Sequence, residues 1–325
     1  DFYLNHAIEV DVDCVSDGDE VVIGGIMQHV EQAGVHSGDS GCSLPPYSLS
    51  KEIQDEIRRQ TKAMAKALNV VGLMNVQFAV QDDVVYVLEV NPRASRTVPF
   101  VSKATSAPLA KIAARAMAGI SLAEQNFHEE IIPDYYSVKE AVFPFIKFPG
   151  VDTILGPEMR STGEVMGVGK TFSEAYLKAQ MGAGERIPKM GKVFISVRDE
   201  DKADLETMAR NFLEQGYGLC ATGGTANKLS ELGFYVQKIH KVAEGRPHIL
   251  DYIKNGEIAV VVNTVSSDAK AIADSHAIRR TSINLRVPLY TTLAGGEAVS
   301  EGVKSMFAMD VYSVQELHAH LKSQK

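Results

Sequence analysis

Residues 88–96 read Leu-Glu-Val-Asn-Pro-Arg-Ala-Ser-Arg, and they follow a run of β-branched and aromatic residues that begins at Val84. Residues 84–90 and 73–80 are both typical of strands, and Asp82-Asp83 between them is typical of a hairpin turn. We therefore expect the stretch 88–96 to emerge from the end of a two-stranded hairpin.

This hairpin would bring three oxygen-bearing side chains together. Glu89 and Asn91 lie two residues apart at the end of a strand, so they point to the same face. Gln77 shares that face if it pairs directly with Glu89. That pairing requires a loop with an odd number of residues, such as 82–84, rather than a two-residue turn.

The residue types at this point suit a cation and a phosphate. Magnesium takes oxygen ligands, usually with one or two carboxylates, and phosphate oxygens complete its shell. Arg93 and Arg96 follow directly and can donate forked hydrogen bonds to phosphate or carboxylate groups. Because phosphoryl transfer depends mostly on positioning and charge stabilisation, the pattern predicts a phosphoryl-transfer site. The alternative is a strand that ends in a solvated loop with incidental charges.

The rest of the first half is also mixed α and β. Residues 7–13 alternate between apolar and acidic residues, which predicts a strand with Glu9, Asp11 and Asp13 on one face. A loop rich in Gly and Ser covers about 31–49, and loops of this length are usually functional or disordered.

The pattern changes after Gly191, where strand-like and helix-like segments begin to alternate. The predicted strands are 192–197, 217–221, 234–239 and 258–262, and the predicted helices are 200–215, 225–232 and 247–255. This alternation favours a Rossmann-like parallel sheet covered on both faces. We therefore expect an α/β protein with two domains, 1–188 and 189–325.

A second ligand loop is predicted in this half. Residues 221–226 read Ala-Thr-Gly-Gly-Thr-Ala, between a predicted strand and a predicted helix. Small residues let backbone N–H groups approach a phosphate, and the helix N-terminus favours negative charge. The alternative is a tight turn that binds nothing.

Composition limits the classes of function. The 325 residues carry a formal charge of −8, which argues against a nucleic-acid partner because phosphate backbones attract basic surfaces. No apolar run approaches the length of a membrane span. Cys14, Cys42 and Cys220 have neither metal-ligand spacing nor the even number of a disulfide framework. We therefore expect a cytoplasmic protein without a nucleic-acid or membrane partner.

The string 88–96 resembles the signature of the carbamoyl phosphate synthetase large-subunit family, whose members contain ATP-grasp domains. The resemblance implies a partial ATP-grasp α+β domain followed by a methylglyoxal-synthase-like domain. In such sites two Mg²⁺ or Mn²⁺ ions lie between the phosphates of ATP, and the matching metal ligands are Gln77, Glu89 and Asn91. Arg93 and Arg96 match the arginines that support the phosphates and the carbamate, and with Asn91 they are the catalytic candidates.

The same resemblance assigns ligands for nucleotide and for K⁺. The positions that match ATP contacts are Leu4, Glu9, Gly34, Val35, His36, Ser37, Gln77 and Glu89. The positions that match K⁺ ligands are Glu9, His29, Gln32, Val35 and Ser40. Without the resemblance, Glu9 would be interpreted as a solvent-facing strand residue and His29 as a structural histidine.

Members of this family have two ATP-grasp halves, and the half before the regulatory domain phosphorylates carbamate. The implied reaction converts carbamate and ATP to carbamoyl phosphate and ADP, for pyrimidine and arginine biosynthesis. The resemblance also implies a separate glutaminase small subunit and a homo-oligomer of the large subunit. Because the chain begins at Asp1 directly before strand-like alternation, we expect a lobe of the ATP site to lie upstream. We therefore expect the chain alone to make no carbamoyl phosphate.

The second half resembles the regulatory domain of the family, which binds UMP as inhibitor and IMP as activator. The matching positions are Ser196, Lys202, Thr222, Thr225, Lys241, Asn263, Thr264 and Ser275. The related fold also contains a lyase that needs an aspartate after the strand 258–262. Asn263-Thr264-Val265 supplies no such carboxylate, so a regulatory binder is favoured.

Activation by ornithine is less well supported. Acidic residues suit a diamino cation, and the positions that match the ornithine site are Glu31, Asp39, Glu140 and Thr291. The family has a Tyr-Asp-Thr run at the last of these, but this chain has Leu289-Tyr290-Thr291.

Two further alternatives remain open. One is a free-standing regulatory nucleotide-binding protein. The other is a different ATP-grasp ligase such as a biotin carboxylase, which would lack the domain after residue 190.

Overall fold

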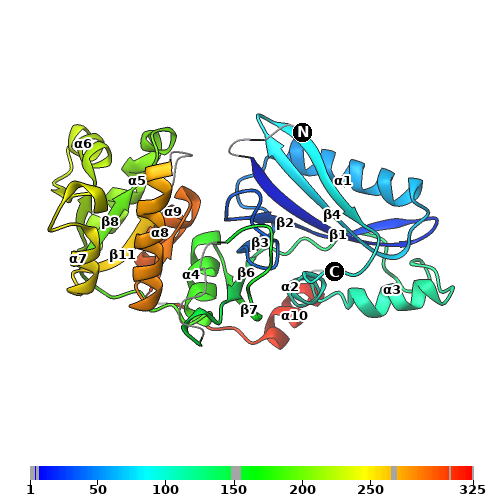
Figure 1. The fold of residues 1–325 in the computed structure, drawn as a ribbon. Coiled ribbons are helices and arrows are strands. Elements are labelled where there is room, and N and C mark those ends of the chain that lie inside the picture. The colour runs from blue at the N-terminus through cyan, green and yellow to red at the C-terminus, as the bar shows by residue number, and fades with distance from the viewer. Residues whose placement is uncertain (1–3, 5–6, 148–154, 265–268, 307–308, 324–325) are drawn as a thin grey trace.

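The computed structural model of the chain describes residues 4, 7–147, 155–264, 269–306 and 309–323. Within these ranges the strands form two sheets, which lie side by side in Figure 1. In the described part of the chain, no helix is both long and apolar enough to cross a membrane.

The first sheet has seven antiparallel strands in the order β5-β4-β1-β2-β3-β6-β7. Its strands are β1 (Ile8–Asp17), β2 (Val21–His29), β3 (Cys42–Leu44), β4 (Val71–Gln81), β5 (Val84–Asn91), β6 (Tyr136–Val142) and β7 (Gly163–Gly169). The helices of this half are α1 (Lys51–Ala67), α2 (Val98–Thr105), α3 (Leu109–Met117), the 3₁₀ turn η1 (Phe145–Lys147) and α4 (Phe172–Gly182).

Alternation along β1 explains how this sheet is covered. Val10 and Val12 lie on the face that packs against α1, where Ile53 and Ile57 complete an apolar cluster. The opposite face of β1 is apolar only near its end, where Val15 packs in the cluster that contains α2 and α3. The remainder of that face therefore stays polar, and it carries the residues considered below.

The second sheet has five parallel strands in the order β10-β9-β8-β11-β12. Its strands are β8 (Lys192–Ser196), β9 (Gly218–Ala221), β10 (Gln237–Lys238), β11 (Ile258–Asn263) and β12 (Leu289–Tyr290). The helices of the second half of the sequence are η2 (Glu200–Asp204), α5 (Leu205–Glu214), α6 (Gly223–Glu231), η3 (Val242–Glu244), α7 (Ile249–Lys254), α8 (Ala269–Asn284), α9 (Leu293–Gly302), η4 (Val303–Ser305) and α10 (Val314–Ser323).

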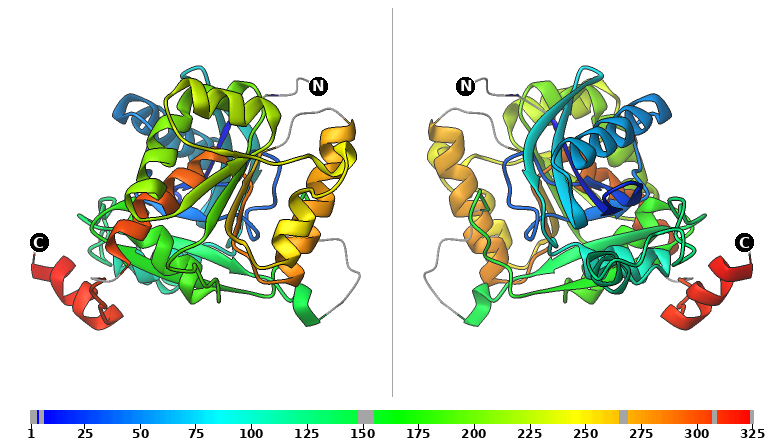
Figure 2. Two further views of the ribbon diagram at one scale, coloured as in Figure 1. Left: turned by 90° about the vertical axis from the view of Figure 1, so that its left-hand side faces the viewer. Right: turned by 90° about the vertical axis from the view of Figure 1, so that its right-hand side faces the viewer.

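Helices cover both faces of the second sheet (Figure 2), as the alternating apolar strands predict. Val193 and Ile195 of β8 face the cluster that contains α5, α6 and α9. Phe194 between them faces α7 and α8 on the other side. The predicted α/β class with a parallel second sheet is confirmed. The predicted strand 234–239 is much longer than β10, which is the edge strand of the sheet.

The two sheets share a hydrophobic core. One apolar cluster combines Tyr176 and Leu177 of α4 with Val193 of β8 and Val299 of α9. Helix α10 then returns to the first half, where Leu317 and Leu321 pack on Tyr135 at the edge of the molecule (Figure 2). The predicted division into 1–188 and 189–325 stays a prediction.

The hairpin between β4 and β5 differs from its predicted form. Asp82 and Asp83 have φ values of 50° and 61°, so they form a two-residue turn in the left-handed region, which suits Asp. An odd loop was therefore the wrong expectation. A register shift between Gln77 and Phe78 adds one residue to β5, and Gln77 pairs directly with Glu89. The bulge thus produces the pairing that the loop was expected to produce.

Candidate functional site

The first candidate site lies on the polar face of β1. Glu9, Asp11 and Asp13 are all buried and occupy alternate positions on one face of the strand. On the neighbouring strand β4, Gln77 pairs with Asp11 and Asn75 pairs with Asp13. We use the name polar face for the surface made by Glu9, Asp11 and Asp13 of β1, Asn75 and Gln77 of β4, and Glu89 and Asn91 of β5.

The three predicted metal ligands lie on this polar face. Gln77 pairs with Glu89, and Asn75 pairs with Asn91, so the side chains of β4 and β5 point the same way. Glu89 is exposed, whereas Gln77 and Asn91 are half-buried. One carboxylate and two amides form an oxygen-donor set that fits Mg²⁺ when phosphate oxygens complete the shell.

No group of three or more His, Cys, Asp or Glu suited to a metal ion occurs within the described ranges. The predicted set does not require such a group, since two of its three members are amides.

Arg93 and Arg96 lie in the segment 92–97 between β5 and α2, which we call the arginine loop. Both arginine side chains are exposed. The guanidinium group of Arg96 contacts the sulfur of Met159, and a Cβ added to Gly38 would lie 3.0 Å from the same sulfur. Met159 therefore connects the arginine loop with the glycine-rich loop predicted to contact ATP.

Glu9 and His29 meet at the start of that glycine-rich loop. Nδ1 of His29 lies 3.8 Å from Glu9, and Nε2 lies 2.9 Å from Asp11. Burial alone would lower the pKa of His29, but Cys42 and the hydrogen bond with Asp11 raise this pKa well above its usual value. Burial raises the pKa of Glu9.

The loop that follows is fixed by its own hydrogen bonds. Gly34 has a φ of +96° and donates its backbone N–H to the Glu9 carboxylate at 3.0 Å. The Val35 N–H donates to the Gln32 carbonyl at 3.3 Å, and the His36 N–H donates to the Gly156 carbonyl at 2.8 Å. The ring of His36 accepts from the N–H of Gly38 at 3.0 Å.

The remaining loop candidates are held in different ways. The Ser37 carbonyl accepts from the buried Lys139 ammonium at 3.0 Å. The Ser40 hydroxyl is buried and donates to the His36 carbonyl at 3.4 Å. Gln32 is exposed and Leu4 is half-buried. The structure thus brings Glu9, His29 and the backbone at Gly34 together.

The predicted ornithine residues separate into two groups. Glu31 accepts from the Gly41 N–H at 2.5 Å and Glu140 accepts from Gln180 at 2.8 Å, and both carboxylates border Gly41. Burial raises the pKa of both carboxyls, and for Glu140 the charge of Glu31 adds to this effect. Asp39 instead accepts the backbone N–H groups of residues 160 and 161, at 2.8 Å each.

Thr291 is half-buried next to Tyr290, a buried tyrosine on β12. The Tyr290 hydroxyl has no hydrogen-bond partner among the described residues, and burial raises its pKa well above the usual value. The neighbouring Thr292 hydroxyl donates to the Val30 carbonyl at 3.0 Å, which joins α9 to the first half.

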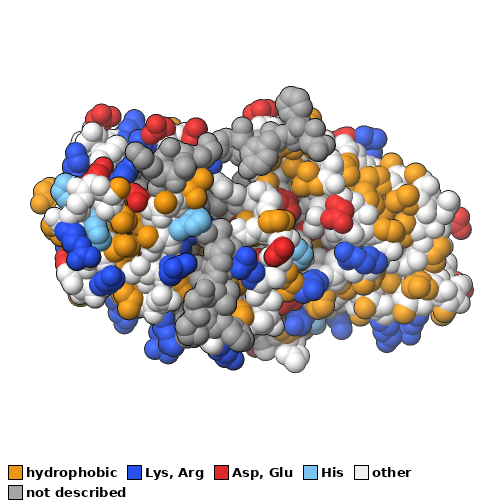
Figure 3. All heavy atoms as spheres, in the orientation of Figure 1, with side chains coloured by type: hydrophobic (Ala, Val, Ile, Leu, Met, Phe, Trp, Pro, Cys, Tyr) orange, Lys and Arg blue, Asp and Glu red, His pale blue; other side chains and the backbone are white. Residues whose placement is uncertain are grey.

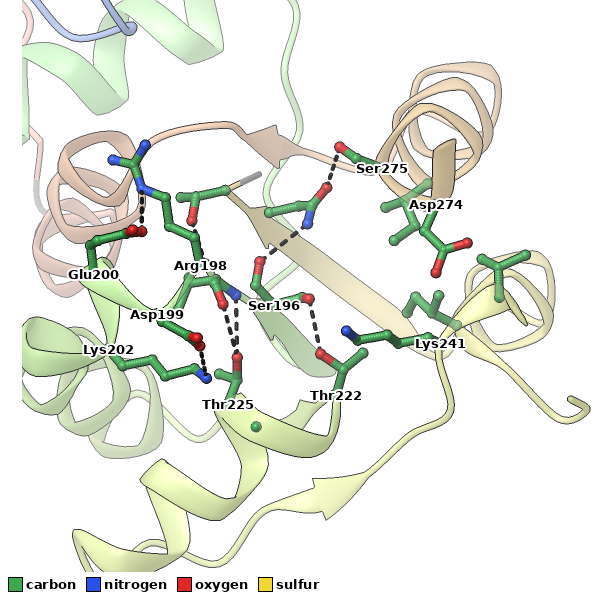
Figure 4. A pocket seen from close by; sticks show the side chains of 17 residues that line it. Ser196, Arg198, Asp199, Glu200, Lys202, Thr222, Thr225, Lys241, Asp274 and Ser275 are labelled. Atoms are coloured by element: carbon green, nitrogen blue, oxygen red, sulfur yellow. Dashed lines mark hydrogen bonds and ion pairs between the residues drawn. The ribbon is translucent and has the colours of Figure 1, made fainter. Parts of the chain in front are cut away.

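The second candidate site is a cavity of about 290 Å³ in the second half (Figure 4). All of the residues predicted for the regulatory nucleotide line it, namely Ser196, Lys202, Thr222, Thr225, Lys241, Asn263, Thr264 and Ser275. The cavity lies at the carboxyl ends of β8, β9 and β11, where parallel α/β sheets bind ligands.

Hydrogen bonds among the lining residues hold the floor of this cavity in place. Ser196 and Thr222 share a hydrogen bond of 2.9 Å. Asn263 donates to the Ser196 carbonyl at 3.1 Å and accepts from Ser275 at 2.7 Å. These polar groups come from the ends of β8 and β11, from the N-cap of α6 and from α8. Figure 4 shows Ser196, Thr222 and Ser275 around the cavity.

Charged side chains of both signs line the cavity near α6. Lys202 forms an ion pair with Asp199, and a Cβ added to Gly224 would lie 2.7 Å from the Lys202 ammonium. The helix therefore brings its N-terminus close to this ammonium because residue 224 is glycine. Lys241, exposed, lines the cavity from the segment after β10.

Sequence reasoning missed residues in both sites. In the cavity it missed Arg198, Asp199, Glu200 and Asp274. In the first site it missed Asn75 and the role of Asp13, although alternation already placed Asp13 on the same face as Glu9. Figure 3 shows Lys and Arg spread over both halves of one face, with Asp and Glu between them.

Two protein families match the sequence. The family described as "Carbamoyl-phosphate synthase L chain, ATP binding domain" matches residues 1–125, and the "MGS-like domain" family matches residues 204–291. A solved biotin carboxylase domain of a single-chain bacterial carboxylase covers 55% of this chain and 47% of its own at a TM-score of 0.45 and 16% identity. That likeness is too weak to add to the argument.

Curated relatives match almost the whole chain. The carbamoyl phosphate synthase large chain of Neisseria meningitidis serogroup A is 74% identical over 99% of this chain, and that of Pasteurella multocida is 70% identical over 99%. The chain spans 30% of the length of both relatives. By these matches, the chain belongs to the family of the carbamoyl phosphate synthase large chain.

Proposed function

We propose that the polar face and the arginine loop form part of a site that phosphorylates carbamate with ATP in the complete large chain. The observation that carries this proposal is the direct pairing of Gln77 with Glu89, two residues before Asn91. It gathers one carboxylate and two amide oxygens beside a loop with two exposed arginines.

The chemistry follows from these groups. A carbamate oxygen attacks the γ-phosphorus of ATP, the bond from this phosphorus to the β,γ-bridging oxygen breaks, and ADP leaves. Gln77, Glu89 and Asn91 would hold Mg²⁺ or Mn²⁺, which neutralises phosphate charge when bound. Arg93 and Arg96 can donate forked hydrogen bonds to phosphate and carbamate oxygens.

Glu9 and the glycine-rich loop would hold the nucleotide and a K⁺ ion. Glu9 offers two acceptor oxygens, which suit the two hydroxyl groups of a ribose. The carboxylate of Glu9, the carbonyl of Val35 and the hydroxyl of Ser40 are oxygen donors of the kind that bind K⁺. Nδ1 of His29 lies 3.8 Å from the Glu9 carboxylate, so a protonated His29 ring would attract it.

The reverse reaction provides the test. The complete large chain, given carbamoyl phosphate, ADP and Mg²⁺ without bicarbonate or glutamine, should form ATP. If no ATP forms, the proposed function is wrong. The 325-residue chain alone should form none, since we propose that a further lobe completes the ATP site. We also propose that a glutaminase small subunit is the partner of the complete large chain, although the reverse reaction does not need it.

We further infer that the second half regulates this reaction through a nucleotide. Its cavity gathers eight predicted residues, with two lysines and the N-terminus of α6 on one side. Calorimetry with the chain should detect binding of UMP or IMP at millimolar concentration. The absence of heat with both nucleotides would contradict a regulatory binder.

A further inference from the structure

The buried carboxylate of Asp13 is not needed as a ligand of metal or nucleotide in the proposed site. It is 1% exposed and lies on β1, an interior strand between β2 and β4. Burying a carboxylate is costly unless hydrogen bonds satisfy it. Its partners therefore indicate what it does.

Two of these partners belong to the arginine loop. Oδ1 of Asp13 accepts from the Ser95 hydroxyl at 2.7 Å, and Oδ2 accepts from the Thr97 hydroxyl at 2.6 Å. The oxygens of the two hydroxyls also lie 2.8 Å apart. Both carboxylate oxygens are thus engaged by residues on either side of Arg96.

The burial pattern shows that these are the inward-facing positions of the loop. Pro92, Arg93, Ala94 and Arg96 are exposed, whereas Ser95 is half-buried and Thr97 is 3% exposed. The loop has no regular secondary structure of its own between β5 and α2. Its attachment to the sheet therefore depends strongly on Asp13.

The behaviour of Thr97 supports this interpretation independently. Thr97 is the residue before α2, where a threonine hydroxyl usually caps the backbone N–H groups of the helix. Here Thr97 has helical dihedral angles and makes no such cap, and its hydroxyl goes to Asp13 instead. The Thr97 hydroxyl therefore attaches the arginine loop to Asp13 and does not cap α2.

Asp13 is also connected to the strand that carries the metal-ligand candidates. Asn75 donates to Asp13 at 3.0 Å and to Asp11 at 3.3 Å, and its backbone pairs with Asn91. The anchor of the arginine loop and the end of β5 are therefore held by one residue of β4.

We propose that Asp13 is a positioning residue that, through Ser95 and Thr97, holds the arginine loop in place beside the polar face. This inference rests on the proposed function. A misplacement of about 1 Å in a reacting group can lower a rate by about a hundred-fold. Charge-assisted hydrogen bonds from the loop to the fixed carboxylate of Asp13 would prevent such a misplacement.

The test uses two opposite substitutions of Thr97 in the complete large chain. Thr97→Val keeps the shape and removes the hydroxyl, whereas Thr97→Ser keeps the hydroxyl and removes the methyl group. The kcat for ATP formation from carbamoyl phosphate and ADP should decrease about ten- to a hundred-fold in Thr97→Val. It should stay within about threefold of wild type in Thr97→Ser, and the KM for ADP should change little in both.

Thr105→Val is the matched control, since Thr105 is also buried in α2 but donates only to the Val101 carbonyl of its own helix. Ser95→Ala is the second variant if Thr97→Val does not fold, and it should also lower kcat. Activity retained in Thr97→Val but lost in Thr97→Ser would mean packing and would overturn the inference. A complete large chain of wild-type sequence that forms no ATP would instead overturn the proposed function.

Discussion

The two candidate sites are assembled in different ways. The cavity of the second half lies where parallel strands end, so topology alone brings Ser196, Thr222 and Asn263 together. The polar face lies on one face of an antiparallel sheet, on β5, β4 and β1, where a slip of one residue would move Glu89 to the other side. A site at strand ends therefore tolerates errors in register, whereas a site on a sheet face forms only when the register is correct.

The largest expected effect is the loss of ATP formation when Glu89 on the polar face is substituted. Glu89→Gln keeps the shape and removes the charge of the only carboxylate among the three predicted ligands of Mg²⁺ or Mn²⁺. ATP formation from carbamoyl phosphate and ADP by the complete large chain should decrease about 10²- to 10³-fold. The control is Asp83→Asn, which removes a charge in the turn of the same hairpin, where Asn also tolerates a positive φ.

The contribution of the buried Asp13, on the same face, to the stability of the fold should change with pH. Burial raises the pKa of Asp13 to about 6, although hydrogen bonds from Thr97, Ser95 and Asn75 oppose the shift. The folded chain thus keeps a proton that the unfolded chain releases near its ordinary pKa of 3.8. This carboxyl contributes most stability below about pH 4, and about 3 kcal/mol of that contribution is lost as pH rises through about 6.

Denaturant unfolding of wild type and Asp13→Asn at several pH values measures this contribution. The difference in unfolding free energy, wild type minus variant, should decrease between about pH 4 and pH 6 and stay constant above that range. Other buried carboxyls titrate in both proteins and cancel in the difference. A difference independent of pH would contradict the shift.

At the cavity, each single substitution of a lining residue should weaken nucleotide binding by a moderate factor. Lys202→Ala removes an ammonium group beside the N-terminus of α6 and should weaken binding of UMP about tenfold, the value of one charge-assisted hydrogen bond. Lys254→Ala, an exposed lysine at the end of α7 outside the cavity, is the control. Equal effects of the two substitutions in calorimetry would exclude a direct contact.

The smallest effect is expected at the junction of the two halves. Asp39 is engaged by the backbone at 160 and 161, and Tyr290 occupies the position of the expected aspartate. Ornithine should therefore change the rate of the complete enzyme by less than about twofold. Strong activation would show that Glu31 and Glu140 are sufficient to bind a diamino cation.

The cavity at the strand ends could be predicted from the sequence better than the polar face, because the two sites are assembled differently. The class of the second half and the ligand loop at 221–226 could be predicted from the pattern, because alternating strands and helices leave only one edge for a ligand. The full set of cavity residues was predicted from the resemblance to the family. The pairing of Gln77 with Glu89 was predicted for the wrong reason, since nothing in the sequence marks the bulge in β5. The role of Asp13 could not be predicted, because it depends on where the hydroxyls of Ser95 and Thr97 point.

The return of α10 has a consequence for synthesis of the protein. His318 bonds the Lys103 carbonyl at 2.8 Å, and Leu317 covers Tyr135, so this helix packs on residues made long before it. At about 5–20 residues per second, the ribosome leaves that apolar patch open to water for on the order of ten seconds or more. The nascent first half is thus most prone to aggregation before its last helix arrives.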